Sequence, residues 1–275
     1  MRAQIAHTAD MAHCNKSYFL LIIVLIAAIS AIAALQCAPF FVCAAEDTEE
    51  MASYTTSYAS SGAGRAHNIR LAASALNDIT IQPGQELSFN AAVGARTAER
   101  GYAQAKVISD GEYVEGIGGG VCQVSSTLFN AWVLAGLEVV RVQCHSLPSG
   151  YVPMSQDATV SEYIDLVLKN SAAFPVKVRT QADGTDLNIA IFGKKQPFRV
   201  TLLPEILSVV PAGEDIEYVD SLPEGEEYVI ARDPKPGYRT RLVAAYTYPN
   251  GKVIKKQLRR DFYRPTDAKI LMIAD

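Results

Sequence analysis

The sequence has little of what nucleic-acid-binding, nucleotide-binding or metal-binding proteins require. Its 25 Lys and Arg residues against 29 Asp and Glu residues give a net charge of -4, and no block of like charge suggests a nucleic-acid partner. The glycine run at 116–120 lacks the Gly-Lys-Ser/Thr ending of a phosphate-binding loop. His145 is the only histidine after His67, so a closed zinc spacing is missing. We therefore expect no metal and no cofactor.

Few cysteines remain for the folded part of the chain. Three of the five, Cys14, Cys37 and Cys43, belong to the N-terminal leader, which leaves Cys122 and Cys144. In an oxidising compartment these two could form one bridge, and two cysteines allow no other pairing. A disulfide-rich scaffold is excluded, whereas a single bridge stays open.

Charge is absent from Tyr18 to Leu35, and the apolar character continues to Ala45. This stretch can span a hydrocarbon core of roughly 30 Å at about 1.5 Å per residue. Basic residues precede it and acidic residues follow it, which predicts a cytoplasmic segment at 1–17, a transmembrane anchor at 18–45 and an extracytoplasmic remainder at the cell membrane. A cleavage signal at 42–45 keeps a second interpretation open, in which the leader is removed and the protein is secreted or wall-associated.

Residues 46–64 are acidic and then rich in Ser, Thr and Gly, which is typical of a linker. Apolar residues at helical spacing predict a short helix at 65–77. Two hairpins are expected, one around Pro83-Gly84 and one around Asp110-Gly111. A second helix is predicted from Val121 to about Gly136, followed by several β-branched strands.

These elements predict an α+β domain at 65–195, with a few helices packed on a mainly antiparallel sheet. Residues 196–275 contain more Pro and Glu and predict a separate small all-β domain. Its Asn250-Gly251 pair is the strongest hairpin signal in the chain.

Cys122 is the main candidate for chemistry because it follows the glycine run and begins the second predicted helix. A helix N-terminus favours the thiolate, and the free amides of residues 121–123 could hold an oxyanion. His145 is the candidate base, and Asp157 or Asp165 could orient its imidazole. Spacing alone leaves three other interpretations open: a buried cysteine, a bridge from Cys122 to Cys144, and a histidine with a structural role.

From Asn68 to Gly193 the sequence resembles the VanW domain, a family named for an accessory protein of vancomycin-resistance clusters. The resemblance rests on PGQELSFN, GGGVCQVSSTLFNA with AGL after it, Arg141, His145-Ser146, YVP, DATV, and Asp165-Leu166 with Asn170. The chain departs from the family at Met154-Ser155-Gln156, where a glycine is common, and this predicts an altered turn before Asp157.

The resemblance implies an activity of the L,D-transpeptidase type without the usual L,D-transpeptidase fold. Cys122 would attack the carbonyl of the third residue of a peptidoglycan tetrapeptide stem and expel D-Ala, while His145 manages the protons and Asp157 orients it. The resemblance and the glycine run together suggest these substrate-binding or oxyanion positions: Gly119, Gly120, Gln123, Ser125, Arg141 and Ser146.

Two other functions stay open at this point. Transfer of the acyl group to water instead of an amine would make an L,D-carboxypeptidase. A non-catalytic wall-binding or scaffold protein associated with glycopeptide resistance would use Cys122 structurally. Residues 196–275 also resemble the five-glycine β module that often follows VanW domains, through Gly237 and Gly251, and this implies binding to wall glycan strands.

Overall fold

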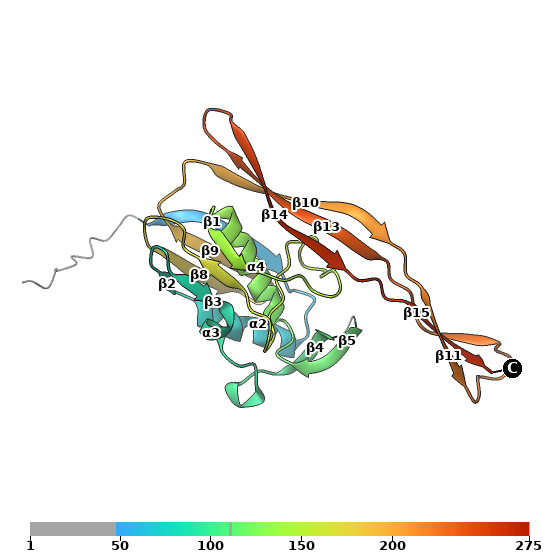
Figure 1. Cartoon of the computed structure of the whole chain (residues 1–275). Coiled ribbons are helices and arrows are strands. Elements are labelled where there is room, and N and C mark those ends of the chain that lie inside the picture. The colour runs from blue at the N-terminus through green and yellow to red at the C-terminus, as the bar shows by residue number, and fades with distance from the viewer. Residues whose placement is uncertain (1–47, 110–111, 275) are drawn as a thin grey trace, which may run out of the picture. The chain divides into compact units, whose positions relative to one another are not determined.

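The computed structural model describes residues 48–109 and 112–274 (Figure 1). The expected cytoplasmic segment at 1–17 and the expected membrane span at 18–45 lie outside these residues. Within the described part, no helix has the length and apolar character needed to cross a membrane.

The main sheet has four antiparallel strands in the order β1-β9-β8-β2, with bounds Glu49–Ser57, Asp186–Gly193, Val176–Ala182 and Thr80–Ile81. β8 and β9 are consecutive in the chain and pair antiparallel as a hairpin. The linker expected at 46–64 is wrong in part, because β1 pairs with β9 along almost its whole length. Thr and Tyr are also good strand formers, and Thr56 of β1 is buried against the helical layer.

Two helices cover one face of this sheet, α2 (Ala63–Leu76) and α4 (Val121–Leu134) (Figure 1). Both were predicted, and Gly136 follows α4 with φ 76°, as the expected left-handed end of a helix. The apolar face of α4 is buried, and so are its polar residues from Gln123 to Asn130. The helix is therefore surrounded on all sides, which its amphipathic pattern did not indicate.

The hairpin expected around Pro83-Gly84 is wrong, although strands lie on both sides of the turn. β2 pairs with β8, whereas β3 (Glu86–Ser88) pairs with β7 (Val167–Lys169), which also pairs with β6 (Glu138–Arg141). Asn170 holds the turn between the two sheets: its backbone bonds Gly84 and Gln85, and its side-chain amide donates to the Ile81 carbonyl. Two short elements follow β3, α3 (Phe89–Val93) and the 3-10 helix η1 (Ala98–Arg100).

The second predicted hairpin is confirmed. β4 (Gln104–Ser109) and β5 (Glu112–Ile117) pair antiparallel in the expected register across the Asp-Gly turn, whose two residues lie outside the described part. This hairpin leads directly into the glycine run before α4.

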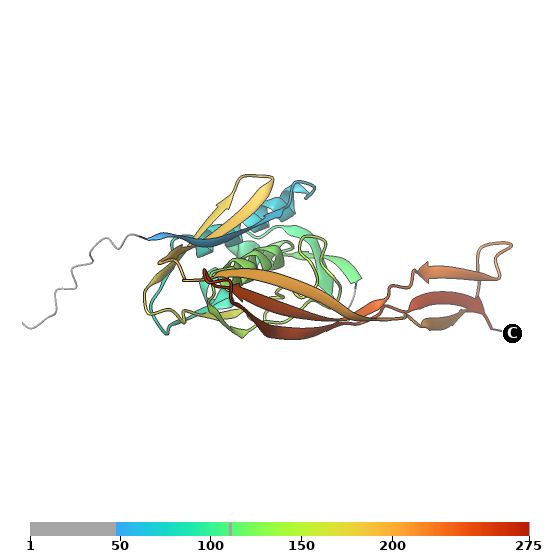
Figure 2. The same ribbon diagram turned by 90° about the horizontal axis from the view of Figure 1, so that it is seen from above.

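Residues 199–273 form two further sheets, with strand orders β10-β13-β14 and β11-β15-β12. The bounds are Arg199–Val210, Gly237–Thr247 and Val253–Tyr263 for the first, and Glu214–Val219, Ala268–Ile273 and Tyr228–Arg232 for the second. The chain passes from one sheet to the other three times, from β10 to β11, from β12 to β13 and from β14 to β15. The two sheets therefore lie end to end (Figure 2). All pairs are antiparallel except β11 with β15.

The Asn250-Gly251 hairpin joins β13 to β14 as predicted, and three α-helices with mainly antiparallel sheets make the described part α+β. The structure changes character between β9 and β10, near the expected boundary at 195. However, Val200, Leu242 and Ala244 belong to the same buried core as α2 and α4. The first C-terminal sheet therefore packs on the preceding domain, and the described residues form one compact unit.

Candidate active site

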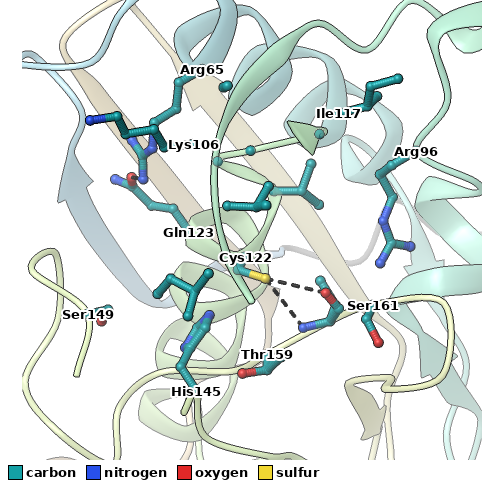
Figure 3. A pocket seen from close by; sticks show the side chains of 18 of the residues that line it. Arg65, Arg96, Lys106, Ile117, Cys122, Gln123, His145, Ser149, Thr159 and Ser161 are labelled. Atoms are coloured by element: carbon teal, nitrogen blue, oxygen red, sulfur yellow. Dashed lines mark hydrogen bonds between the residues drawn. The ribbon is translucent and has the colours of Figure 1, made fainter. Parts of the chain in front are cut away.

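A cavity of about 1680 Å³ opens at the N-terminal ends of α2 and α4 (Figure 3). Its walls come from the start of α2, the β4–β5 hairpin, the glycine run with the first residues of α4, and two loops at 143–151 and 159–164. Both cysteines of the described chain and His145 line it.

Cys122 is the second residue of α4, and its side chain is partly exposed to this cavity. Gly120, two residues earlier, allows the chain to turn sharply into the helix. Its φ is 105°, a conformation that residues with a side chain rarely adopt. A loop residue, Val160, holds the sulfur in place, with its carbonyl 3.4 Å and its N–H 3.5 Å from Cys122 Sγ. The predicted thiol at a helix start is therefore present.

His145 and Asp157 form the rest of the arrangement, and both are buried. Asp157 Oδ2 accepts two hydrogen bonds from His145, one from the backbone N–H and one from Nδ1, each 2.7 Å long. Since Nδ1 is bound to the carboxylate, Nε2 is the ring nitrogen left to interact with the Cys122 thiol, and the pKa values of the two groups depend on each other. The three predicted side chains thus stand in line as thiol, imidazole and carboxylate.

The electrostatics of this line favour a charged pair. Burial raises the pKa of Cys122, but the hydrogen bond and positive charge of His145 outweigh burial and hold that pKa below its ordinary value. Burial lowers the pKa of His145, and its bonds to Asp157 and Cys122 more than reverse this, raising it to about 9. These shifts favour the form in which Cys122 is a thiolate and His145 an imidazolium.

Only part of the predicted oxyanion arrangement is present. The N–H groups of Val121 and Gln123 are used within the turn, donating to the carbonyls of Gly118 and Gly120. Within residues 48–109 and 112–274, the N–H groups of Gly119, Gly120 and Cys122 have no acceptor, and all three residues line the cavity. These three amides remain available to a developing oxyanion.

The other predicted substrate contacts lie in different places. Ser146 is exposed and lines the cavity. Gln123 also lines the cavity, but its amide is held by hydrogen bonds to Thr56 and Ser57, and Ser125 is buried and bonded to the Ala158 carbonyl. Arg141 is exposed on β6 and is not part of the cavity wall.

Two alternatives from the sequence are not supported. Asp165 caps α3, accepting hydrogen bonds from the Ser88 hydroxyl at 2.6 Å and the Asn90 N–H at 2.9 Å, and so does not orient His145. Cys122 and Cys144 are free thiols rather than a bridge. Burial and the charges of Asp261 and Asp157 raise the pKa of Cys144 to about 11, so this thiol stays protonated.

Several cavity residues had no signal in the sequence. Arg65, Arg96 and Lys106 line the cavity, and in Figure 3 His145 and Arg96 lie on opposite sides of the Cys122 sulfur. The hydroxyls of Ser149 and Thr159 also belong to lining residues, and within the described part they have no hydrogen-bond partner. Isolated basic and hydroxyl residues in five separate segments cannot be grouped before the fold is known. No group of three or more His, Cys, Asp or Glu residues among those described is arranged to hold a metal ion.

The fold and the site together describe an α+β protein that carries a thiol at a helix start, followed by an imidazole and a carboxylate. Residues 64–192, from α2 to β9, match the family model "VanW like protein", so this segment is similar to the domain of that family. The match does not include β1 or the C-terminal sheets.

Two curated proteins are similar to this chain. "Uncharacterized protein YoaR" of Bacillus subtilis (strain 168) is 39% identical over 166 residues, which cover 60% of this chain and 55% of that protein. "Vancomycin B-type resistance protein VanW" of Enterococcus faecalis is 29% identical over 136 residues, covering 47% and 50%. The chain thus spans about half the length of the curated relatives it matches. A solved structure, "Crystal structure of HP0197-G5", matches 28% of this chain and 99% of its own chain, with 19% identity and a TM-score of 0.18.

Proposed function

We propose that this protein is a cysteine-dependent acyltransferase of the bacterial cell envelope, acting on peptidoglycan stem peptides as an L,D-transpeptidase. The observation that carries the proposal is the line from Cys122 through His145 to Asp157 at the wall of an open cavity. The similarity to a vancomycin-resistance protein supports a role at the cell envelope.

The first half of the reaction forms a thioester. The Cys122 thiolate attacks the carbonyl carbon of the third residue of a donor stem, and the negative charge on the carbonyl oxygen is stabilised by the amides at 119, 120 and 122. The peptide C–N bond then breaks. The departing D-Ala amine takes the proton of the His145 imidazolium.

The second half transfers the acyl group. An amine of a second stem attacks the thioester carbonyl, His145 accepts a proton from that amine, and the C–S bond breaks to restore the Cys122 thiolate. The product is a cross-link between two third-position residues. Attack by water in the same step would release a tripeptide and make the protein an L,D-carboxypeptidase.

The chemistry of the cavity wall suits such a donor. A peptide stem carries carboxylates and many amide groups, and Arg96 stands where it influences the thiol from the side opposite His145. Its guanidinium donates one bond to Asn90 Oδ1 at 2.8 Å and has further donors that could bind the terminal carboxylate of the donor.

The proposal includes a location and a second contact with the wall. An anchor at 18–45 would hold the folded part on the outer side of the membrane, where stem peptides are found. The two C-terminal sheets would bind glycan strands and bring the cavity to its substrate.

The test is mass spectrometry of the purified chain before and after incubation with tetrapeptide muropeptides. We expect an acyl adduct on Cys122 together with one released D-Ala per adduct. The Cys122→Ala variant should form neither, and analysis of the final products separates cross-linked dimers from free tripeptides.

Cys144→Ala is the matched control, because it removes the other thiol of the same cavity. It should keep the adduct, since the Cys144 thiol is protonated at neutral pH. An adduct that persists in Cys122→Ala, or no adduct in the unmodified chain, would contradict the proposal and favour a non-catalytic wall-binding protein.

A further inference from the structure

The carboxylate at the end of the catalytic line is held from a second side by the C-terminal sheet. Tyr263, the last residue of β14, is fully buried and donates its hydroxyl hydrogen to Asp157 Oδ1 at 2.5 Å. His145 occupies the other oxygen, Oδ2, with two hydrogen bonds. Both oxygens of Asp157 are thus bound, one to the imidazole and one to a strand outside the matched segment 64–192.

Arg259 of β14 holds the backbone of the same residue. Its Nη1 donates to the Asp157 carbonyl at 2.9 Å, and its Nη2 pairs with Asp261 at 2.6 Å. The guanidinium also lies over the ring of Phe129 in α4, 5.7 Å from the ring centroid. Side chain and main chain of Asp157 are therefore both fixed by one strand.

The turn before Asp157 needs this support. Ser155 has φ 65°, a left-handed conformation that costs free energy in a residue other than glycine. Its N–H donates to the Tyr263 hydroxyl at 2.7 Å, and its own hydroxyl shares a 2.6 Å hydrogen bond with Thr240 of β13. The altered turn expected from the sequence is thus bound to the C-terminal sheet at two points.

We propose that the C-terminal sheet is part of the active site, with Tyr263 as the positioning residue that holds Asp157 toward His145. The inference rests on the proposed function of Cys122 and adds a residue that the family segment does not contain. Without the Tyr263 hydroxyl, one buried carboxylate oxygen loses its donor, and the carboxylate is free to rotate or to take up a proton.

The consequence reaches Cys122 through the imidazole. A protonated or rotated Asp157 no longer stabilises the His145 imidazolium, and the thiolate then loses its partner, so the thiol titrates at higher pH. A variant that lacks only the Tyr263 hydroxyl keeps the other charged or titratable groups near Asp157. These groups lie on the loop before Asp157 and on β14: Cys144, His145, Tyr151, Arg259 and Asp261.

The experiment measures the rate of iodoacetamide alkylation at Cys122 in the full-length chain between pH 4 and pH 9. Peptide mapping by mass spectrometry distinguishes Cys122 from the other cysteines. In Tyr263→Phe, which removes a single oxygen, we expect the midpoint of the profile to move upward by about one pH unit, the effect of losing one hydrogen bond to a charged group.

Thr240→Val is the matched control. It removes the other buried hydrogen bond between this sheet and Ser155 but does not touch Asp157. We expect a loss of stability in urea unfolding similar to that of Tyr263→Phe, with an unchanged alkylation midpoint. An unchanged midpoint in Tyr263→Phe, or equal shifts in both variants, would show a purely structural contact and overturn the inference.

A second variant covers the case in which Tyr263→Phe does not fold. Arg259→Lys keeps a positive charge beside Asp261 but cannot also reach the Asp157 carbonyl, and it should raise the midpoint in the same direction. No shift there would count against the inference. Alkylation needs no muropeptide, so a shifted midpoint without acyl adducts would overturn the proposed function and leave the positioning role standing.

Discussion

The two thiols differ sharply in chemistry although both line the same cavity. Cys122 has a lowered pKa because of its interaction with His145. Cys144 lies near the carboxylates of Asp261 and Asp157, and burial with these charges raises its pKa to about 11. Local charge, not exposure to the cavity, therefore decides which sulfur is the nucleophile.

Replacing His145 by Gln tests this difference. The variant removes the positive charge that lowers the pKa of Cys122, so burial raises that pKa toward or above its ordinary value of 9. We expect the alkylation rate of Cys122 at pH 6 to fall at least about tenfold, as each unit of pKa changes the thiolate fraction tenfold. Cys144 in the same sample is the internal control, and an unchanged rate at Cys122 would contradict the thiolate assignment.

Residue types identified the reacting groups but not the residues that support them. A thiol at a helix start, one histidine and an acidic residue nearby could be named before the fold was known. Gln123 and Ser125 belong to the same sequence run and turned out to be bonded inside the core. Tyr263 lies 106 positions from Asp157, and no local pattern connects the two.

At the scale of elements, the start of α4 depends on a glycine. Gly120 is the N-cap of α4 with φ 105°, and a Cβ atom there would lie 2.9 Å from Arg65 Cγ and 3.0 Å from Ile69 Cγ1 in α2. The helices α2 and α4 therefore approach each other closely at this residue. The close contact fixes the position of Cys122, two residues further on.

Gly120→Ala should lower the free energy of unfolding by about 3 kcal/mol, from backbone strain and from the clash with α2. Gly84→Ala is the control, since φ is 77° there and nothing lies within 4 Å of the added Cβ. It should cost only the conformational term of about 1–2 kcal/mol. Urea unfolding measures both, and equal losses would show that the contact with α2 has no effect.

Elements with a local signal were predicted, and elements that depend on distant partners were not. The helices α2 and α4 and the hairpins β4–β5 and β13–β14 follow from periodicity and turn residues. β1 was interpreted as a linker because only its pairing with β9 makes it a strand. The strands beside Pro83-Gly84 pair with partners about 80 to 100 residues away, which the turn itself cannot indicate.

At the scale of the whole molecule, three site groups affect the pH dependence of stability. The pKa of His145 is raised from 6.5 to about 9, so its contribution is complete below pH 6.5 and is lost as pH rises through 9. The pKa of Cys122 lies below 9, so its contribution is complete above pH 9 and is lost as pH falls through the folded value. Asp157 contributes above pH 3.8 and loses this contribution only in stronger acid.

Between the pKa of folded Cys122 and pH 9 the first two contributions oppose each other, because a rise in pH removes the contribution of His145 and adds that of Cys122. We expect the free energy of unfolding from these two groups together to change less with pH than the contribution of His145 alone. The Cys122→Ser variant lacks the thiolate, so its contribution no longer opposes that of His145. The hydrogen bond to Asp157 still raises the pKa of His145. We therefore expect the free energy of unfolding of this variant to fall by about 1–2 kcal/mol from pH 6.5 to pH 8.5. Urea unfolding of both proteins at several pH values measures the difference, in which all other titrating groups cancel. Parallel curves would mean that Cys122 and His145 do not share a proton in the folded protein.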